Sequence, residues 1–112
     1  MKIGSTPSLM KNKCLFTVKT PIGLTVRTTQ TYWNLIQIKH PEIKGNLFFL
    51  KETLKMPDLI SKSRIDKTVL LFYKRMNGYW LCVVTKNNVL EGFIITAYIT
   101  DKIKEGEKIW GN

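Results

Sequence analysis

Acidic residues, histidine and cysteine are scarce in this sequence. Its 112 residues include eight Asp and Glu residues, one histidine and two cysteines. One histidine and two cysteines without paired spacing, Cys14 and Cys82, cannot supply a His/Cys zinc set. We therefore expect no metal site and no cofactor. Separated cysteines of this kind are typical of reduced thiols, which favours a cytoplasmic location.

Long hydrophobic runs are missing as well. The longest unbroken apolar stretch is the six residues Tyr79–Val84, whereas a membrane-spanning helix needs about 18 or more. The first residues, Met1 to Thr6, contain no apolar signal-peptide core. A membrane span, a secretion signal and a membrane partner are therefore not expected. With 44% hydrophobic residues, the chain predicts a single folded domain over residues 1–112, in which residues 1–13 form a loose arm.

Positive charge is in large excess and unevenly distributed. Lys and Arg number 18 against eight acidic residues, a formal net charge of +10, and residues 1–41 contain six basic residues and no acidic one. Such a field attracts polyanions and speeds their encounter. It favours nucleic acid or an acidic protein as partner over an anionic lipid surface, for which no suitable amphipathic helix is predicted. The alternative is a solvated basic surface without a specific partner.

Turn signals and hydrophobic spacing predict the order of the elements. Two β-rich runs, 14–20 and 24–28, flank a Pro-Ile-Gly turn and predict a hairpin. Apolar spacing predicts one helix that ends at His40 and another over 47–56 that stops at Pro57. Strand-like runs follow around 61–65 and at 69–75, 79–86 and 92–100. The expected fold class is α+β, with an N-terminal β-hairpin and two helices packed on a four-stranded antiparallel meander sheet.

Side-chain alternation predicts which face of the meander carries polar groups. In the last strand, the face expected to meet the helices is wholly apolar: Phe93, Ile95, Ala97 and Ile99. In the first meander strand, the residues expected to join that core are Leu70 and Phe72. The opposite face, which we expect to be open, then carries hydroxyl groups and a cation: Tyr73, Arg75, Thr96 and Tyr98.

That face, together with His40, can supply the groups for RNA cleavage without a metal. The reaction needs a base for the 2′-hydroxyl, an acid for the leaving oxygen, and donors or cations for the charge on phosphorus. Histidine titrates near neutral pH, so His40 is the candidate base or acid. The arginine fork fits phosphate oxygens, which makes Arg75 or Arg64 the candidate for transition-state charge.

The remaining candidates, Tyr73, Tyr98 and Thr96, can stack on a base, donate a proton or hydrogen-bond to phosphate. Each candidate also has an ordinary structural explanation. Tyrosines in strands commonly pack with a solvated hydroxyl, and threonine is a good strand former. A histidine before proline can simply cap a helix, and Arg75 beside a turn can keep a hairpin soluble.

A set of short motifs runs in order along the chain from about Leu15 to Trp110: Tyr32-Trp33, Lys39-His40-Pro41, residues 51–54 with Pro57-Asp58, 71–74, 80–84, and 92–98 with 100–103. Together they resemble the small phage-associated branch of the barnase, EndoU, colicin and RelE-like ribonuclease superfamily. The resemblance implies two helices against a four-stranded antiparallel sheet and metal-independent cleavage through a 2′,3′-cyclic phosphate. It also implies site roles for His40, Tyr73, Thr96 and Tyr98.

The leading hypothesis is therefore an endoribonuclease, acting as a toxin or phage-conflict effector, with RNA as substrate and an acidic antitoxin or immunity protein as partner. The alternatives are a non-catalytic RNA-binding module and a protein whose basic surface serves to bind an antitoxin. Either RNA hypothesis requires contacts to the strand from basic and aromatic side chains. The candidates for those contacts are Lys39, Lys51, Arg64, Lys74, Lys102 and Trp110.

Overall fold

The computed structural model describes residues 14–111 of the chain. The elements in chain order are β1 (Cys14–Lys19), β2 (Thr25–Thr29), α2 (Gln30–Lys39), the 3-10 helix η1 (Pro41–Ile43), α3 (Leu47–Lys55), β3 (Leu59–Ser63), β4 (Val69–Met76), β5 (Tyr79–Asn87), β6 (Glu91–Thr100) and β7 (Gly106–Gly111). The arm expected at residues 1–13 lies outside this range. None of the helices in residues 14–111 is long and apolar enough to cross a membrane.

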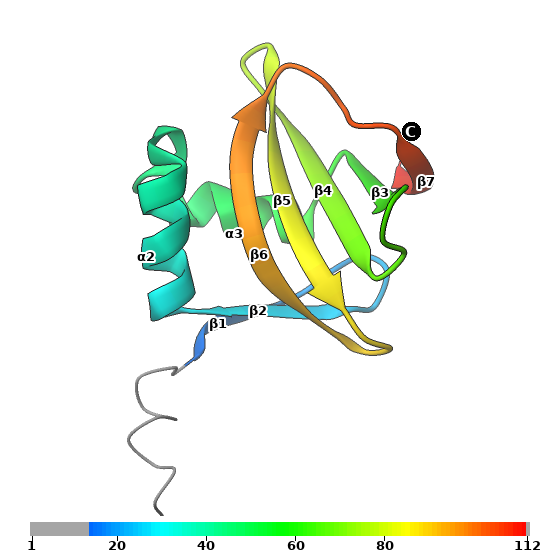
Figure 1. Ribbon diagram of the computed structural model, residues 1–112, viewed down its shortest axis with the longest axis horizontal. Coiled ribbons are helices and arrows are strands. Elements are labelled where there is room, and N and C mark those ends of the chain that lie inside the picture. The colour runs from blue at the N-terminus through cyan, green and yellow to red at the C-terminus, as the bar shows by residue number, and fades with distance from the viewer. Residues whose placement is uncertain (1–13, 112) are drawn as a thin grey trace, which may run out of the picture.

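All seven strands belong to one mixed sheet with the order β1-β2-β6-β5-β4-β3-β7. Strands β2 and β6 pair in parallel over Thr25–Arg27 and Glu91–Phe93, and the other neighbours are antiparallel. Figure 1 shows α3 behind the strongly curved strands and α2 beside β6, while β1 and β2 run across the lower end of the sheet. The helices therefore cover one face, and the other faces the viewer.

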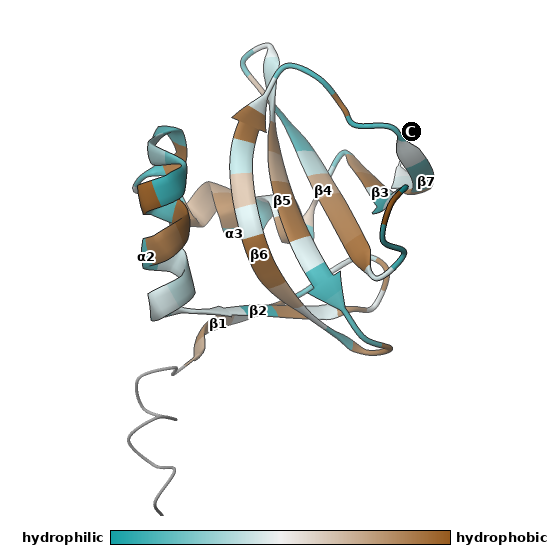
Figure 2. Cartoon of the chain, viewed as in Figure 1, coloured by the Kyte–Doolittle hydropathy of each residue, from teal (hydrophilic) through white to brown (hydrophobic). Residues whose placement is uncertain are grey.

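The predicted fold, a hairpin and two helices on a four-stranded antiparallel meander, is wrong in its sheet. The hairpin is part of the sheet through the parallel β2–β6 pairing, and β7 adds a seventh strand beside β3. Strand β7 was not predicted from the sequence. The connection that leads to it from β6 is mostly hydrophilic, as Figure 2 shows, so no apolar pattern leads into this strand. Gly106 also lies so close to β3 that a Cβ atom there would be 2.5 Å from the Lys62 carbonyl oxygen.

Local signals place the other elements where they were expected. The Thr29 hydroxyl accepts a hydrogen bond from the Tyr32 amide at 3.1 Å, which caps α2. That helix ends at His40, whose amide donates to the Ile36 carbonyl before Pro41 interrupts the helix. Asn77 and Gly78 both have positive φ, as the tight β4–β5 turn requires.

The main core lies between the helices and the back of the sheet, and the predicted Leu70 and Phe72 belong to it. The alternation predicted for β6 is wrong in its first half, because the β5–β6 register shifts between Val84 and Thr85. Such a bulge moves every residue on one side of it to the opposite face. Ile94 is consequently buried, whereas Phe93 and Ile95, expected in the core, are 43% and 40% exposed.

Candidate functional site

Three rows of paired side chains cross the face of the sheet that turns away from the helices, which we call the front face. Its rows, read from β4 through β5 to β6, are Leu71–Val84–Thr96, Tyr73–Cys82–Tyr98 and Arg75–Trp80–Thr100. The structure thus brings four of the predicted site residues onto one face. They do not, however, lie in the same row or have the same exposure.

The middle row is covered rather than open. Tyr73 and Cys82 are fully buried, and the Tyr73 hydroxyl accepts a hydrogen bond from the Lys104 amide at 3.1 Å. The segment 101–105, which leaves the upper end of β6 and runs toward β7 (Figure 1), therefore passes over the hydroxyl end of Tyr73. The expectation that Tyr73 lies on an open face is wrong, because its side chain is buried and its ring packs edge-on against Trp80.

Burial keeps the polar groups of the middle row uncharged. It raises the pKa of Tyr73 to about 12 and that of the Cys82 thiol to about 11. Burial, followed by the proximity of Cys82, also raises the pKa of Tyr98. The Tyr98 hydroxyl oxygen is inaccessible and has no hydrogen bond of ordinary geometry within residues 14–111, and the Cys82 thiol and the Tyr73 side chain both raise its pKa further. Tyr98 therefore offers a ligand its ring and not its hydroxyl, which corrects its predicted proton-donor role.

His40 lies at the β6 side of the middle row. Its ring centre is 5.7 Å from that of Tyr98, with the two planes tilted by 37°. The Nδ1 atom lies 3.5 Å from a Glu42 carboxylate oxygen, which leaves Nε2 outside that pair. The side chain is 31% exposed. The end of α2 therefore holds a partly accessible imidazole at the edge of the front face.

Next to Tyr98 the front face is hollowed. A depression of about 530 Å³ has Leu71, Val84, Thr96 and Tyr98 among its lining residues, and we call it the front hollow. Charged side chains of Arg64, Lys104 and Glu105 also line it, and Arg64 is ion-paired with Glu105. The Lys104 amine lies 5.8 Å from the centre of the Tyr98 ring. A hydroxyl and two cations, of which Arg64 is ion-paired, thus line one depression, and the imidazole lies beside Tyr98, which also lines it.

The other predicted residues lie elsewhere. Arg75 stacks 4.9 Å over the Trp80 ring in the third row, outside the residues that line the front hollow. The Lys74 amine donates to the Met56 carbonyl at 2.7 Å, and the Lys51 amine lies 5.2 Å from the ring of Phe16, a residue of the main core. Also outside the hollow are Lys39 on α2, Lys102 and Trp110 on β7. The predicted RNA-binding set is therefore not one surface.

Sequence reasoning missed Lys104. It lies in a polar connection after β6, and no spacing or motif sets it apart from the other lysines. Only the path of the chain to β7 brings it over the front face. Among residues 14–111, no three His, Cys, Asp or Glu side chains lie close enough together to hold a metal ion. No protein-family model, curated protein or solved structure matched the chain.

The two cysteines provide a chemical test of the covered middle row. In the folded protein at about pH 8, iodoacetamide should modify the exposed Cys14 and leave Cys82 intact. The reason is that the thiolate is the nucleophile. The Cys82 thiol is buried, and its raised pKa keeps it protonated, so it reacts slowly. Peptide mass spectrometry locates the label, and unfolding in urea should make both sites reactive. Rapid labelling of Cys82 in the folded protein would show that segment 101–105 does not cover the front face.

Proposed function

We propose that this protein is a metal-independent endoribonuclease that cleaves RNA through a 2′,3′-cyclic phosphate. The observation that carries the proposal is the contact of the His40 imidazole with Tyr98 beside a hollow that Thr96, Arg64 and Lys104 also line. A base that lies beside a depression lined by a hydroxyl and cations supplies the kinds of group that this reaction needs. The resemblance of the Lys39-His40-Pro41 and Thr96-Ala97-Tyr98 motifs to ribonucleases points in the same direction.

In the proposed reaction, His40 Nε2 takes the proton of a ribose 2′-hydroxyl. The 2′ oxygen then forms a bond to phosphorus, the bond from phosphorus to the 5′ oxygen breaks, and a 2′,3′-cyclic phosphate remains. Lys104 and Arg64 stabilise the charge on the phosphate oxygens, and Thr96 donates a hydrogen bond. The ammonium of Lys104 gives a proton to the leaving oxygen. Afterwards the His40 imidazolium releases its proton to solvent and the Lys104 amine takes one up from solvent. Tyr98 is a positioning residue that holds the imidazole through its ring.

End-labelled single-stranded RNA incubated with the protein in EDTA tests this proposal. We expect products with 2′,3′-cyclic phosphate ends, which chromatography and mass spectrometry distinguish from 3′-hydroxyl ends. Intact RNA that is nevertheless bound, with affinity that falls steeply with salt, would overturn the enzyme in favour of the non-catalytic RNA-binding module. Cleavage that requires an added divalent metal would overturn the mechanism.

The proposal extends to the setting in which the enzyme acts. We infer a toxin or phage-conflict role in the cytoplasm, since such roles are common in the ribonuclease superfamily that the chain resembles. The net charge of +10 favours an acidic antitoxin or immunity protein as inhibitor. Growth arrest on expression, relieved by His40→Ala, is the expected result in cells.

A further inference from the structure

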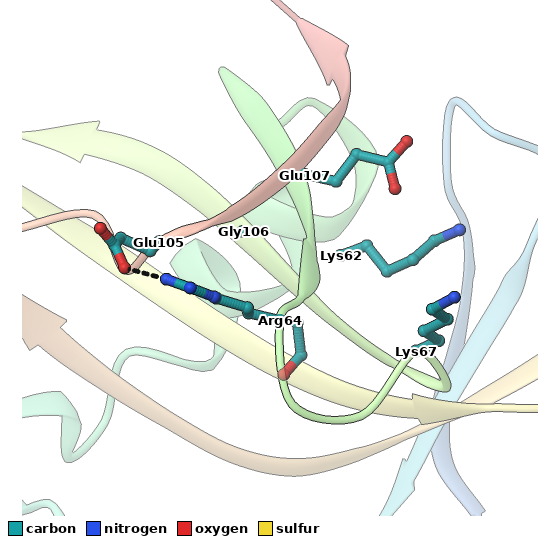
Figure 3. A pocket seen from close by; sticks show the side chains of 7 residues that line it. Lys62, Arg64, Lys67, Glu105, Gly106 and Glu107 are labelled. Carbon is teal, nitrogen blue, oxygen red and sulfur yellow. Dashed lines mark hydrogen bonds and ion pairs between the residues drawn. The ribbon is translucent and has the colours of Figure 1, made fainter.

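The front hollow continues around the edge of the sheet. A second depression of about 520 Å³ shares Ser63, Arg64 and Glu105 with it, and Figure 3 shows this depression at the β3–β4 turn and the start of β7. A third, of about 590 Å³, shares Lys62 and Lys67 with the second. Because each depression has residues in common with the next, the three follow one another around the sheet, and we call them together the rim groove. It connects the candidate reaction centre with the tips of two hairpins.

The cations along the rim groove are of two kinds. Arg64 is paired with Glu105, and the nearby Lys86 is paired with Asp66 at 2.7 Å. By contrast, within residues 14–111 neither Lys62 nor Lys67 forms an ion pair or a hydrogen bond through its amine. Both point away from the Arg64–Glu105 pair, on the side of the groove where the Glu107 carboxylate also lies (Figure 3). Two adjacent amines are therefore available to an anion.

The far end of the rim groove adds exposed apolar side chains to these amines. Val89 and Leu90, in the β5–β6 turn, are 91% and 71% exposed, and Ile22 in the β1–β2 turn lies with them. Asn87 and Asn88 line the same depression, although their side chains are already used to hold the turns. A ligand that fits must combine anionic groups with flat apolar ones, and an unstacked nucleotide does so.

We propose that the rim groove binds single-stranded RNA several nucleotides away from the bond that is cut. Lys62 and Lys67 contact phosphates, and a nucleobase packs against Val89 and Leu90. A single strand fits better than a duplex for two reasons. The groove bends around the sheet edge, and its apolar end can contact only a base that is not stacked on its neighbours in a helix. This inference rests on the proposed function and adds a substrate class to it, namely unpaired RNA long enough to reach both ends of the groove.

The test compares Lys62→Ala/Lys67→Ala with the control Lys44→Ala/Lys55→Ala, which removes the same charge from exposed sites outside the groove. A fluorescent strand of about ten nucleotides, with 2′-deoxyribose to prevent cleavage, reports binding by anisotropy over a salt series. The groove variant should bind about tenfold more weakly and lose roughly 1.4 from the salt slope, as expected for two lost phosphate contacts on a single strand. Its cleavage of a dinucleotide should match that of the unmodified protein.

Each result separates the groove from the reaction centre. Equal affinity and salt slope for the two double variants would overturn the rim groove, whether or not RNA is cleaved. Equal binding of a duplex of the same sequence would overturn the single-stranded substrate class. If no RNA is cleaved and the groove variant still binds ten-nucleotide strands more weakly than the control variant does, the proposed enzyme fails and the groove stands.

Discussion

Replacing His40 with alanine is expected to lower the rate of RNA cleavage by about 10²–10⁴-fold, the usual contribution of a general base. The fold should tolerate the change, because the side chain is partly exposed and its backbone amide, which donates to Ile36, remains. Initial rates measured in EDTA, together with thermal unfolding of the same sample, separate the two effects. A lower rate with an unchanged unfolding temperature is the expected result.

Lys44→Ala is the matched control for this experiment. Lys44 directly follows η1, is exposed, and lies outside the front hollow. Its loss removes one positive charge near His40 but no candidate catalytic group, so the cleavage rate should change little. Equal rates for His40→Ala and Lys44→Ala would show that the imidazole takes no part in the reaction. In that case Lys104 would be the next residue to test.

The largest effect on stability is expected for Phe72→Ala in β4. Phe72 is fully buried in the core behind the sheet, and truncation of such a side chain typically costs about 3–5 kcal/mol. Since domains of this size are stable by only about 5–15 kcal/mol, the variant should lose a large share of its free energy of unfolding. Urea unfolding followed by circular dichroism measures the loss.

Phe48→Ala provides the same chemical change at an exposed position. Phe48 lies on α3 and is 73% exposed, so its truncation should alter the free energy of unfolding by less than about 0.5 kcal/mol. Similar unfolding midpoints for the two variants would contradict the division of the sheet into a helix-covered back and a front face. The placement of the rows of the candidate site depends on that division.

The sequence predicts those elements whose signals are local. The turn between the runs 69–75 and 79–86 and the prolines after the two helices are signalled within a few residues, and the structure has elements that begin or end at these places. The parallel pairing of β2 with β6 joins segments that are far apart in the chain, and no local pattern marks it. The bulge at Ile95 is a property of the paired strands together, so alternation read from one strand misplaces Phe93 and Ile95.

The same distinction applies to the candidate site. Alternation was sufficient to put Tyr73 and Arg75 on one face with Thr96 and Tyr98, because β4 and the second half of β6 are regular. It could not reveal that segment 101–105 covers Tyr73, nor that Lys104 reaches Tyr98. Alternation also gave no reason to choose Lys62 and Lys67 among the many lysines. Only the folded arrangement of β3 and the β3–β4 turn places these two side chains along the rim groove.

The hydrogen bond from the Lys104 amide to Tyr73 has a consequence for the newly made protein. During translation the ribosome releases residues 104–111 after all the other described elements. Lys104 and Glu105 nevertheless line the front hollow, and the pairing of β7 with β3 holds the segment that carries them in place. A nascent chain that has folded as far as β6 therefore lacks one side of the hollow. The hollow is therefore complete only after residues 104–111 have left the ribosome and β7 has paired with β3.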